Sequence, residues 1–196
     1  MTEPIVIIPD NVIYFPSLVS YDETVLLWNE VMSTNDLAYI PITIYGRTCI
    51  QSRMTSYYGA KDFKYSGQTM NAKPIPSLIT SLMERCNIML HSIFKNPFDT
   101  FNSCLVNYYP DGKSNIGHHS DGKTYRMGPN NAVLTVSLGG TRTFQFKSKS
   151  NDQTLDLQLN NGDVVLMYNK TQDLFTHSII KDKSLIPRVS LTFREL

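Results

Sequence analysis

The sequence has few cysteines, almost no net charge and no long apolar run. Its three cysteines, at positions 49, 86 and 104 of 196 residues, are odd in number and far apart. This argues against a disulfide framework or a cysteine-based zinc site and fits a reducing, intracellular compartment. No stretch is long enough to span a bilayer, and the N-terminus lacks the basic start and apolar core of a signal peptide. We expect one domain over residues 1–196, a monomer without membrane attachment, and leave nucleus or cytoplasm open.

The net charge of +1 excludes a polyelectrolyte-like chain, but the cations are unevenly distributed. Residues 39–75 carry five cations against the single acid Asp62, and residues 122–151 carry five cations and no acid. These cations are Arg47, Arg53, Lys61, Lys64 and Lys73, and Lys123, Arg126, Arg142, Lys147 and Lys149. Such a local excess neutralises phosphates in some proteins, whereas in others it is only a solvated face. Charge alone leaves both interpretations open.

The order of periodic segments predicts an α+β fold. A capping box at Ser20 and Glu23 opens a helix over 20–32 with a stripe of Val25, Trp28, Val31 and Met32. A second helix is expected over 76–94, with Leu78, Leu82, Met83, Cys86 and Leu90 on one face. Six short strands follow, over 103–109, 132–138, 143–147, 155–159, 163–168 and 188–196. Gly139-Gly140 and Asn161-Gly162 have hairpin spacing, so an antiparallel sandwich or jelly roll is expected over about 100–196.

The stretch "GHHSDGK" suggests a metal site. Residues i and i+2 of a strand point to the same side, so His119 and Asp121 can face one ion, while His118 has the wrong parity. The remaining histidine in the strand region is His177. Two histidines and one carboxylate form the facial triad of non-haem Fe(II) oxygenases, although zinc accepts the same ligands.

Two arginines of the last strand, Arg188 and Arg194, are six residues apart and therefore share a face. An inward-facing arginine requires an anion, and its guanidinium binds a carboxylate bidentately. A dicarboxylate such as 2-oxoglutarate fits, but six residues of strand span about 20 Å, which is longer than that molecule. Either the two side chains lean together or one of them serves the metal shell.

The combination "LVNYYPDGKSNIGHHSDG", "HSI" and "IPRVSLTFR" resembles the AlkB family of Fe(II)/2-oxoglutarate dioxygenases, from about residue 44 to the C-terminus. The resemblance implies a double-stranded β-helix, Fe(II), 2-oxoglutarate and O₂ as cofactors, and oxidative demethylation of N-alkylated bases in DNA or RNA with release of formaldehyde. It assigns the iron to His119, Asp121 and His177. The implied 2-oxoglutarate contacts are Asn107, Tyr109, Arg188, Ser190, Thr192 and Arg194.

A nucleic-acid substrate must present an unstacked base, so cations and aromatic rings are expected beside the site. Residues 40–75 interleave both and are our predicted substrate-recognition segment. By resemblance, Tyr65 stacks on the flipped base with Phe63 beside it, Tyr45 is a wedge that enters a duplex, and Arg53 joins the substrate contacts. Ordinary tyrosine-rich packing would also explain several of these rings.

One position departs from the family pattern. Repair members usually place an acid directly after the H-x-D motif, where this chain has Gly122 and Lys123, which leaves the alkylated base uncertain. Two other functions stay open. The same cofactor chemistry could act on a protein side chain or small molecule, or the chain could be a nucleic-acid-binding module with a vestigial iron site.

Overall fold

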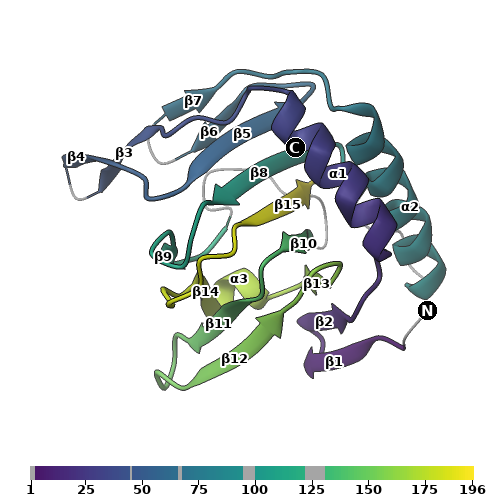
Figure 1. The fold of residues 1–196 in the computed structure, drawn as a ribbon. Coiled ribbons are helices and arrows are strands. Elements are labelled where there is room, and N and C mark those ends of the chain that lie inside the picture. The colour runs from purple at the N-terminus through teal and green to yellow at the C-terminus, as the bar shows by residue number, and fades with distance from the viewer. Residues whose placement is uncertain (1–2, 45, 66–67, 95–99, 122–130) are drawn as a thin grey trace.

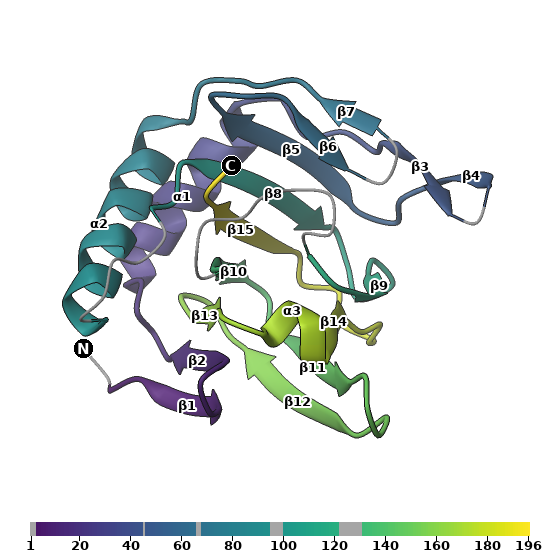
Figure 2. The same ribbon diagram turned by 180° about the vertical axis from the view of Figure 1, so that it is seen from behind.

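Two antiparallel sheets face each other in the computed structural model, which describes residues 3–44, 46–65, 68–94, 100–121 and 131–196. The seven-stranded sheet has the order β1 (Ile5–Ile8), β2 (Val12–Phe15), β13 (Val164–Met167), β10 (Val133–Gly139), β15 (Arg188–Arg194), β8 (Ser103–Tyr109) and β5 (Met54–Gly59). The four-stranded sheet has the order β12 (Thr154–Leu159), β11 (Arg142–Ser148), β14 (Phe175–Ile179) and β9 (Ile116–His119). Figures 1 and 2 show the two layers from opposite sides.

Each face of the seven-stranded sheet carries its own hydrophobic core. Residues of β8, β10, β13 and β15 that point outward pack with α1 (Tyr21–Ser33) and α2 (Ser77–Ile93). Between the sheets, Val133 and Val165 pack with Phe144, Phe146 and Ile179 of the four-stranded sheet. This alternation of the two faces along each strand is the jelly-roll pattern that the strand periodicity predicted.

Both long helices lie where they were expected, with small errors in which residues they bury. The Ser20 side chain accepts a hydrogen bond from the Glu23 N–H at 3.3 Å, so the predicted N-cap is confirmed. The buried stripe of α1 is Thr24, Leu27 and Val31, and the prediction of Val25 was wrong, since 42% of Val25 is exposed. In α2 the stripe begins at Ile79 instead of Leu78; the other four predicted residues are buried.

The predicted hairpins at Gly139-Gly140 and Asn161-Gly162 are wrong. β10 pairs with β13 and β15, whereas β11 pairs with β12 and β14, so Gly139-Gly140 carries the chain from one sheet to the other. The step from β12 to β13 does the same. Gly139 and Gly162 have φ values of +83° and +84°, and this left-handed conformation suits a sharp crossing as well as a hairpin turn.

Two short ribbons extend the molecule near β5 (Figure 1). They are β3 (Pro41–Ile44) with β4 (Arg47–Ile50), and β6 (Phe63–Tyr65) with β7 (Gln68–Met70). β5 lies between them in sequence and pairs with β8, so the segment 40–75 is partly built into the main sheet. No helix in the described part of the chain is long and apolar enough to cross a membrane.

Candidate metal centre and co-substrate cavity

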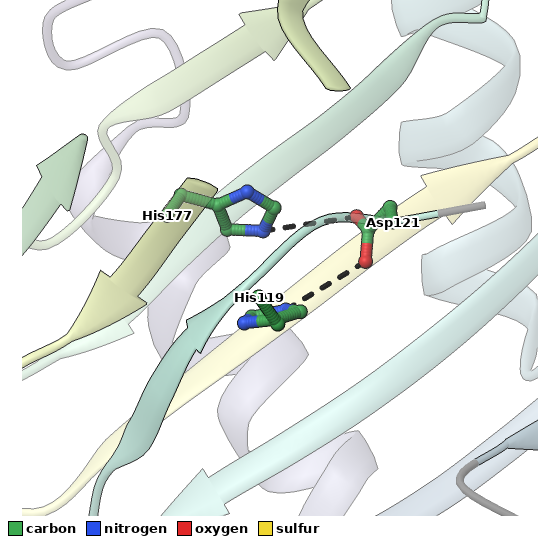
Figure 3. Close-up of side chains that lie close together, drawn as sticks. All are labelled: His119, Asp121 and His177. Carbon is green, nitrogen blue, oxygen red and sulfur yellow. Dashed lines mark ion pairs between the residues drawn. The ribbon is translucent and has the colours of Figure 1, made fainter. Parts of the chain in front are cut away.

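His119, Asp121 and His177 lie together between the sheets (Figure 3). Each offers one ligand atom, and these atoms lie within 4.8 Å of one another. His119 ends β9 and pairs directly with His177 of β14, which brings the two imidazoles to a centroid distance of 4.3 Å. Their Nε2 atoms lie 3.7 and 3.8 Å from the two carboxylate oxygens of Asp121. The parity of β9 places His119 as expected, whereas Asp121 lies in the turn two residues beyond the end of that strand.

His118 points to the other side of β9. Its Nε2 lies 3.0 Å from Gln145 Oε1 and its Nδ1 lies 3.3 Å from Thr176 Oγ1. These partners occupy a polar row on the outer face of the four-stranded sheet. The parity argument that separated His118 from the ligand group agrees with this position.

Neighbouring groups orient the three ligands. His119 Nδ1 donates to the Gly117 carbonyl at 2.9 Å, so its Nε2 presents a lone pair to the centre. The His177 ring stacks on Phe144 at 5.3 Å. The backbone N–H of Asp121 donates to Gln172 Oε1 at 2.8 Å. Gln172 lies in the short helix α3 (Thr171–Leu174) that precedes β14, so a single segment holds both His177 and the turn at Asp121.

The electrostatics favour deprotonated ligands. Burial lowers the pKa of His177 to about 3, with His119 acting in the same direction, and burial also lowers the pKa of His119. Burial alone would raise the pKa of Asp121, but Arg194 and the two histidines outweigh it and hold that pKa well below its usual range. Neutral imidazoles and an ionised carboxylate are the forms that bind a divalent metal.

The inward face of β15 forms one wall of a cavity that opens onto these three residues. Arg188, Ser190, Thr192 and Arg194 all line it, as their alternation predicted, and all four are buried. Opposite them in register on β8 are Tyr109, paired with Arg188, and Asn107, paired with Ser190; both also line the cavity. All six predicted co-substrate residues therefore meet in one place.

Arg188 is the unusual member of this wall. It is 1% exposed, and its Nε donates to Ser137 Oγ at 2.9 Å. Among the described residues, its Nη1 and Nη2 have no hydrogen-bond partner. Burial lowers the pKa of this guanidinium to about 10, which still leaves it charged at neutral pH. A buried cation with two unsatisfied donors fits a carboxylate ligand.

Arg194 has a different environment. Its Nη2 donates to Asp121 Oδ2 at 2.9 Å, so this arginine contacts the metal-ligand group directly. The strand distance between Arg188 and Arg194, about 20 Å, left two alternatives: the side chains lean together, or one arginine contacts the metal ligands. The structure shows the second. Asn107 is also occupied, since its Oδ1 accepts from Arg53 Nε at 2.8 Å.

The predicted substrate residues are not gathered on one surface. Arg53 and Phe63 are each 3% exposed, so neither lies on an open surface, and their contacts with the substrate stay predictions. Phe63 stacks on Tyr57 at 5.0 Å, and the side chain of Arg53 turns into the cavity wall. Tyr45, Gly122 and Lys123 lie outside the described residues; for Tyr65 the structure gives the backbone, paired with Gln68 in the β6–β7 ribbon.

Other cations of the two basic segments are also committed to the fold. Lys73 bonds Asp36 at 2.6 Å, and Lys147 bonds Asp152 at 2.9 Å. Arg142 is 1% exposed and forms an ion pair with Asp182. Arg47, Lys61 and Lys64 are the cations of residues 39–75 that lie exposed in the described part of the chain.

Sequence reasoning missed the residues that support the site. Gln172, Ser137 and Arg142 contact ligand-binding groups without belonging to any motif. For Arg142 the sequence held one indication. It lies two residues before Phe144 at the start of a strand whose side chains alternate, so it should point inward, and an inward cation requires partners.

A family model described as the 2OG-Fe(II) oxygenase superfamily matches residues 11–194. This chain belongs to that superfamily. Its AlkB-like character follows from two mouse relatives. "Alpha-ketoglutarate-dependent dioxygenase alkB homolog 3" is 33% identical over 156 residues, covering 74% of this chain and 51% of the relative. "DNA oxidative demethylase ALKBH2" is 30% identical over 171 residues, covering 81% of this chain and 68% of the relative.

Solved structures support the fold of this AlkB-like oxygenase. The structure titled "The structure of OsALKBH1" superposes with a TM-score of 0.68 at 18% identity, covering 96% of this chain and 100% of the other. An oxidoreductase of the 2OG-Fe(II) oxygenase family from Burkholderia pseudomallei gives 0.65 at 14% identity, covering 95% of this chain and 86% of the other. The chain spans about half the length of the first curated relatives that it matches, as in the 51% of the first mouse protein.

The residues present fit the cofactors of the superfamily, which are Fe(II), 2-oxoglutarate and O₂. Two imidazoles and one carboxylate leave coordination positions open for a chelating ligand. The two unsatisfied donors of Arg188 lie in the wall of the same cavity, where a distal carboxylate would satisfy them. The prediction of an AlkB-like oxygenase with these cofactors is confirmed.

Proposed function

We propose that this AlkB-like oxygenase removes N-alkyl groups from nucleic-acid bases. The observation that carries the proposal is a single cavity. It is lined both by the His119–Asp121–His177 group and by Arg188, whose guanidinium has two unsatisfied donors. The substrate class rests on the similarity to relatives whose names state DNA demethylation and dioxygenase activity. The exposed cations Arg47, Lys61 and Lys64 add a surface for phosphates.

Each residue has a role in this mechanism. His119, Asp121 and His177 would hold Fe(II), and Arg188 would bind the distal carboxylate of 2-oxoglutarate with Tyr109, Ser190 and Thr192 along the wall. When bound, these cofactors supply an oxidation that converts 2-oxoglutarate and O₂ to succinate and CO₂ while one oxygen atom enters the substrate. A hydroxylated N-methyl group then leaves the base as formaldehyde.

The other residues orient these groups and exclude water. Arg194 holds one oxygen of Asp121, which leaves the second oxygen directed at His119. Arg53 fixes Asn107 from behind the cavity wall. Phe144 covers one face of His177 and Ile179 lines the cavity beside it, so water is kept from the reacting centre.

The test is 2-oxoglutarate turnover with added Fe(II) and formaldehyde release on matched single- and double-stranded oligonucleotides carrying 1-methyladenine or 3-methylcytosine. We expect methylated polymers to stimulate turnover and binding to weaken with salt. The Tyr45→Ala variant should lose duplex activity selectively, because only a duplex needs a wedge where the base has left. Turnover that no methylated polymer stimulates, with binding insensitive to salt, would replace this proposal by oxidation of a protein side chain or small molecule.

A further inference from the structure

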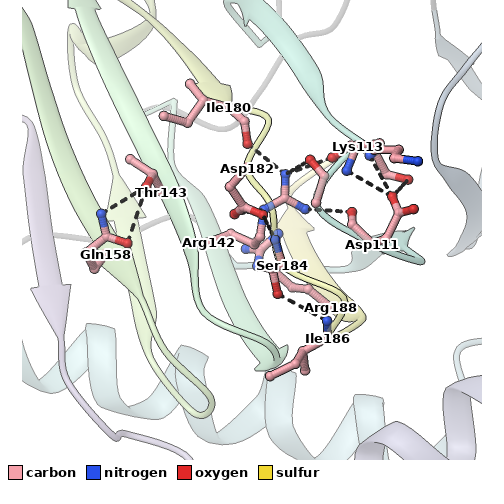
Figure 4. Close-up of polar contacts among 12 residues, drawn as sticks. Asp111, Lys113, Arg142, Thr143, Gln158, Ile180, Asp182, Ser184, Ile186 and Arg188 are labelled. Carbon is pink, nitrogen blue, oxygen red and sulfur yellow. Dashed lines mark hydrogen bonds and ion pairs between the residues drawn. The ribbon is translucent and has the colours of Figure 1, made fainter.

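A second buried arginine, Arg142, lies near the Arg188 end of the co-substrate cavity, and Figure 4 shows its polar contacts. Arg142 opens β11 and does not line the cavity, yet its guanidinium carbon lies 5.6 Å from the centroid of the Tyr109 ring. The guanidinium carbon of Arg188 lies 5.3 Å from the same centroid. One aromatic ring therefore lies against two buried cations, one inside the cavity and one outside it.

The two arginines differ in how their donors are used. Arg142 Nη1 donates to the carbonyl of Asp111 at 3.1 Å, and its Nε forms an ion pair with Asp182 Oδ2 at 2.9 Å. Nη2 faces three further carbonyls, those of Gly112, Ser114 and Ile180, at 3.4, 2.8 and 2.7 Å. Both Nη atoms of Arg142 thus bond protein carbonyls and its Nε faces the Asp182 carboxylate, whereas both Nη atoms of Arg188 lack a hydrogen-bond partner among the described residues.

These partners come from two loops that lead straight into the cavity wall. The loop at 110–115 follows Tyr109, the last residue of β8, and the loop at 180–187 precedes Arg188, the first residue of β15. The loops are also joined by their backbones, since Asp182 N–H donates to the Gly112 carbonyl at 2.9 Å and Gly112 N–H donates to the Ser184 carbonyl at 2.7 Å. A methyl group at Gly112 would collide with Asp182, so the approach requires glycine.

We propose that the Arg142–Asp182 ion pair is a positioning clamp that fixes the length of the co-substrate cavity and so selects a 2-oxo dicarboxylate by chain length. The clamp ties the two loops together behind Tyr109 and thereby sets where the guanidinium of Arg188 stands relative to the metal ligands. A five-carbon dicarboxylate then spans from the metal to Arg188, and a chain one methylene longer does not fit. This inference rests on the proposed role of Arg188 in binding 2-oxoglutarate.

The test compares the affinities of 2-oxoglutarate and 2-oxoadipate, which has one more methylene, for the intact Mn(II)-loaded protein by calorimetry. Both ligands carry the same charge, so the charge that Asp182→Ala removes affects both dissociation constants equally and cancels in their ratio. A change in that ratio therefore reports a change in the geometry of the cavity. One methylene typically gives discrimination of about tenfold or more, and we expect wild type to show it. Asp182→Ala and Arg142→Lys should lose most of that preference while keeping Mn(II) affinity.

Lys147→Gln is the matched control, because it removes an exposed ion pair from the same strand β11. Its ratio should equal that of wild type. Should Arg142→Lys fail to fold, Asp182→Ala decides alone, since the Asp182 side chain is 32% exposed and lies in a loop. The clamp is overturned if the folded variants keep the wild-type ratio of dissociation constants, or if wild type shows no preference between the two ligands. It is also overturned if the variants lose Mn(II) affinity as much as they lose the preference. If wild type binds neither dicarboxylate, the proposed co-substrate function itself fails.

Discussion

The cavity wall and the predicted recognition segment, residues 40–75, differ in structure, although both are built from strands. The wall lies on β8 and β15, which have paired neighbours on both sides along their whole length except at Tyr109, which pairs only with β15. The described part of residues 40–75 contains two short two-stranded ribbons and one strand, β5, that joins a larger sheet. In the first region the side-chain positions follow from alternation. In the second, Arg53 and Phe63 are buried where exposure was expected. Alternation is reliable where pairing on both sides keeps the pleat regular.

The largest expected effect tests the alternation at the metal centre. Substitution of His119 or His177 by Ala should abolish Fe(II)-dependent turnover, because each removes one of three ligands. His118→Ala should keep much of the activity, since that ring contacts Gln145 and Thr176 on the outer face. Turnover and Mn(II) binding are the measurements, and equal losses in all three variants would show that the assignment of ligands is wrong.

The next effect concerns Arg188 at the other end of the cavity. Removing one partner of a buried ion pair costs about 3–5 kcal/mol, so Arg188→Ala should weaken 2-oxoglutarate binding by a factor of 100 or more. Arg188→Lys keeps the charge but loses the bidentate fork and should also bind poorly. Arg47→Ala, which removes an exposed cation of the β3–β4 ribbon, is the control and should leave the co-substrate dissociation constant unchanged. Unaltered binding in Arg188→Ala would contradict its role.

Most of the candidate site was predictable from sequence, and the reason is local. The four residues of β15 share parity, so a regular strand suffices to place them, and the same rule places His119 on the inward side of β9; Asp121 lies two residues beyond the end of that strand. The partner strands were not predictable in this way. Gly139-Gly140 looks the same whether the chain turns back within a sheet or crosses to the other, and only tertiary packing of the two sheets decides. Gln172 and Arg142 act across loops, where no periodicity links them to their partners.

Two aromatic residues of β6 sharpen the contrast within the recognition segment. Phe63 is buried against Tyr57, so Phe63→Ala should lower the free energy of unfolding by about 3–5 kcal/mol. Tyr65→Ala should cost about 1–3 kcal/mol of base stacking on single and double strands alike. Denaturant unfolding and oligonucleotide binding distinguish the two. If Tyr65→Ala loses stability but keeps oligonucleotide binding, the Tyr65 ring packs in the core and does not stack on the substrate base.

The smallest effect is the pH dependence of the metal-free protein. The pKa of His177 is lowered to about 3 in the folded state by burial, whereas an unfolded histidine titrates near 6.5, so the unfolded state binds more protons as pH falls. Stability should therefore decline below about pH 6.5, by about 2 kcal/mol at pH 5 from this group alone. Asp121 does not contribute in that window, because its pKa is also lowered and its share is lost only at more acidic pH.

Chelator-treated protein unfolded in denaturant at pH 7 and pH 5 measures this difference. His177→Gln should reduce the pH dependence, because glutamine has no proton to bind, while His118→Gln on the outer face should keep it. Saturating Mn(II) should not remove this decline, because the metal-bound His177 carries no proton while the unfolded state still binds protons below about pH 6.5. If His118→Gln and His177→Gln change the curve equally, the depressed pKa is not tied to the buried face of the four-stranded sheet. The difference between the two faces of that sheet would then not extend to the protonation of its histidines.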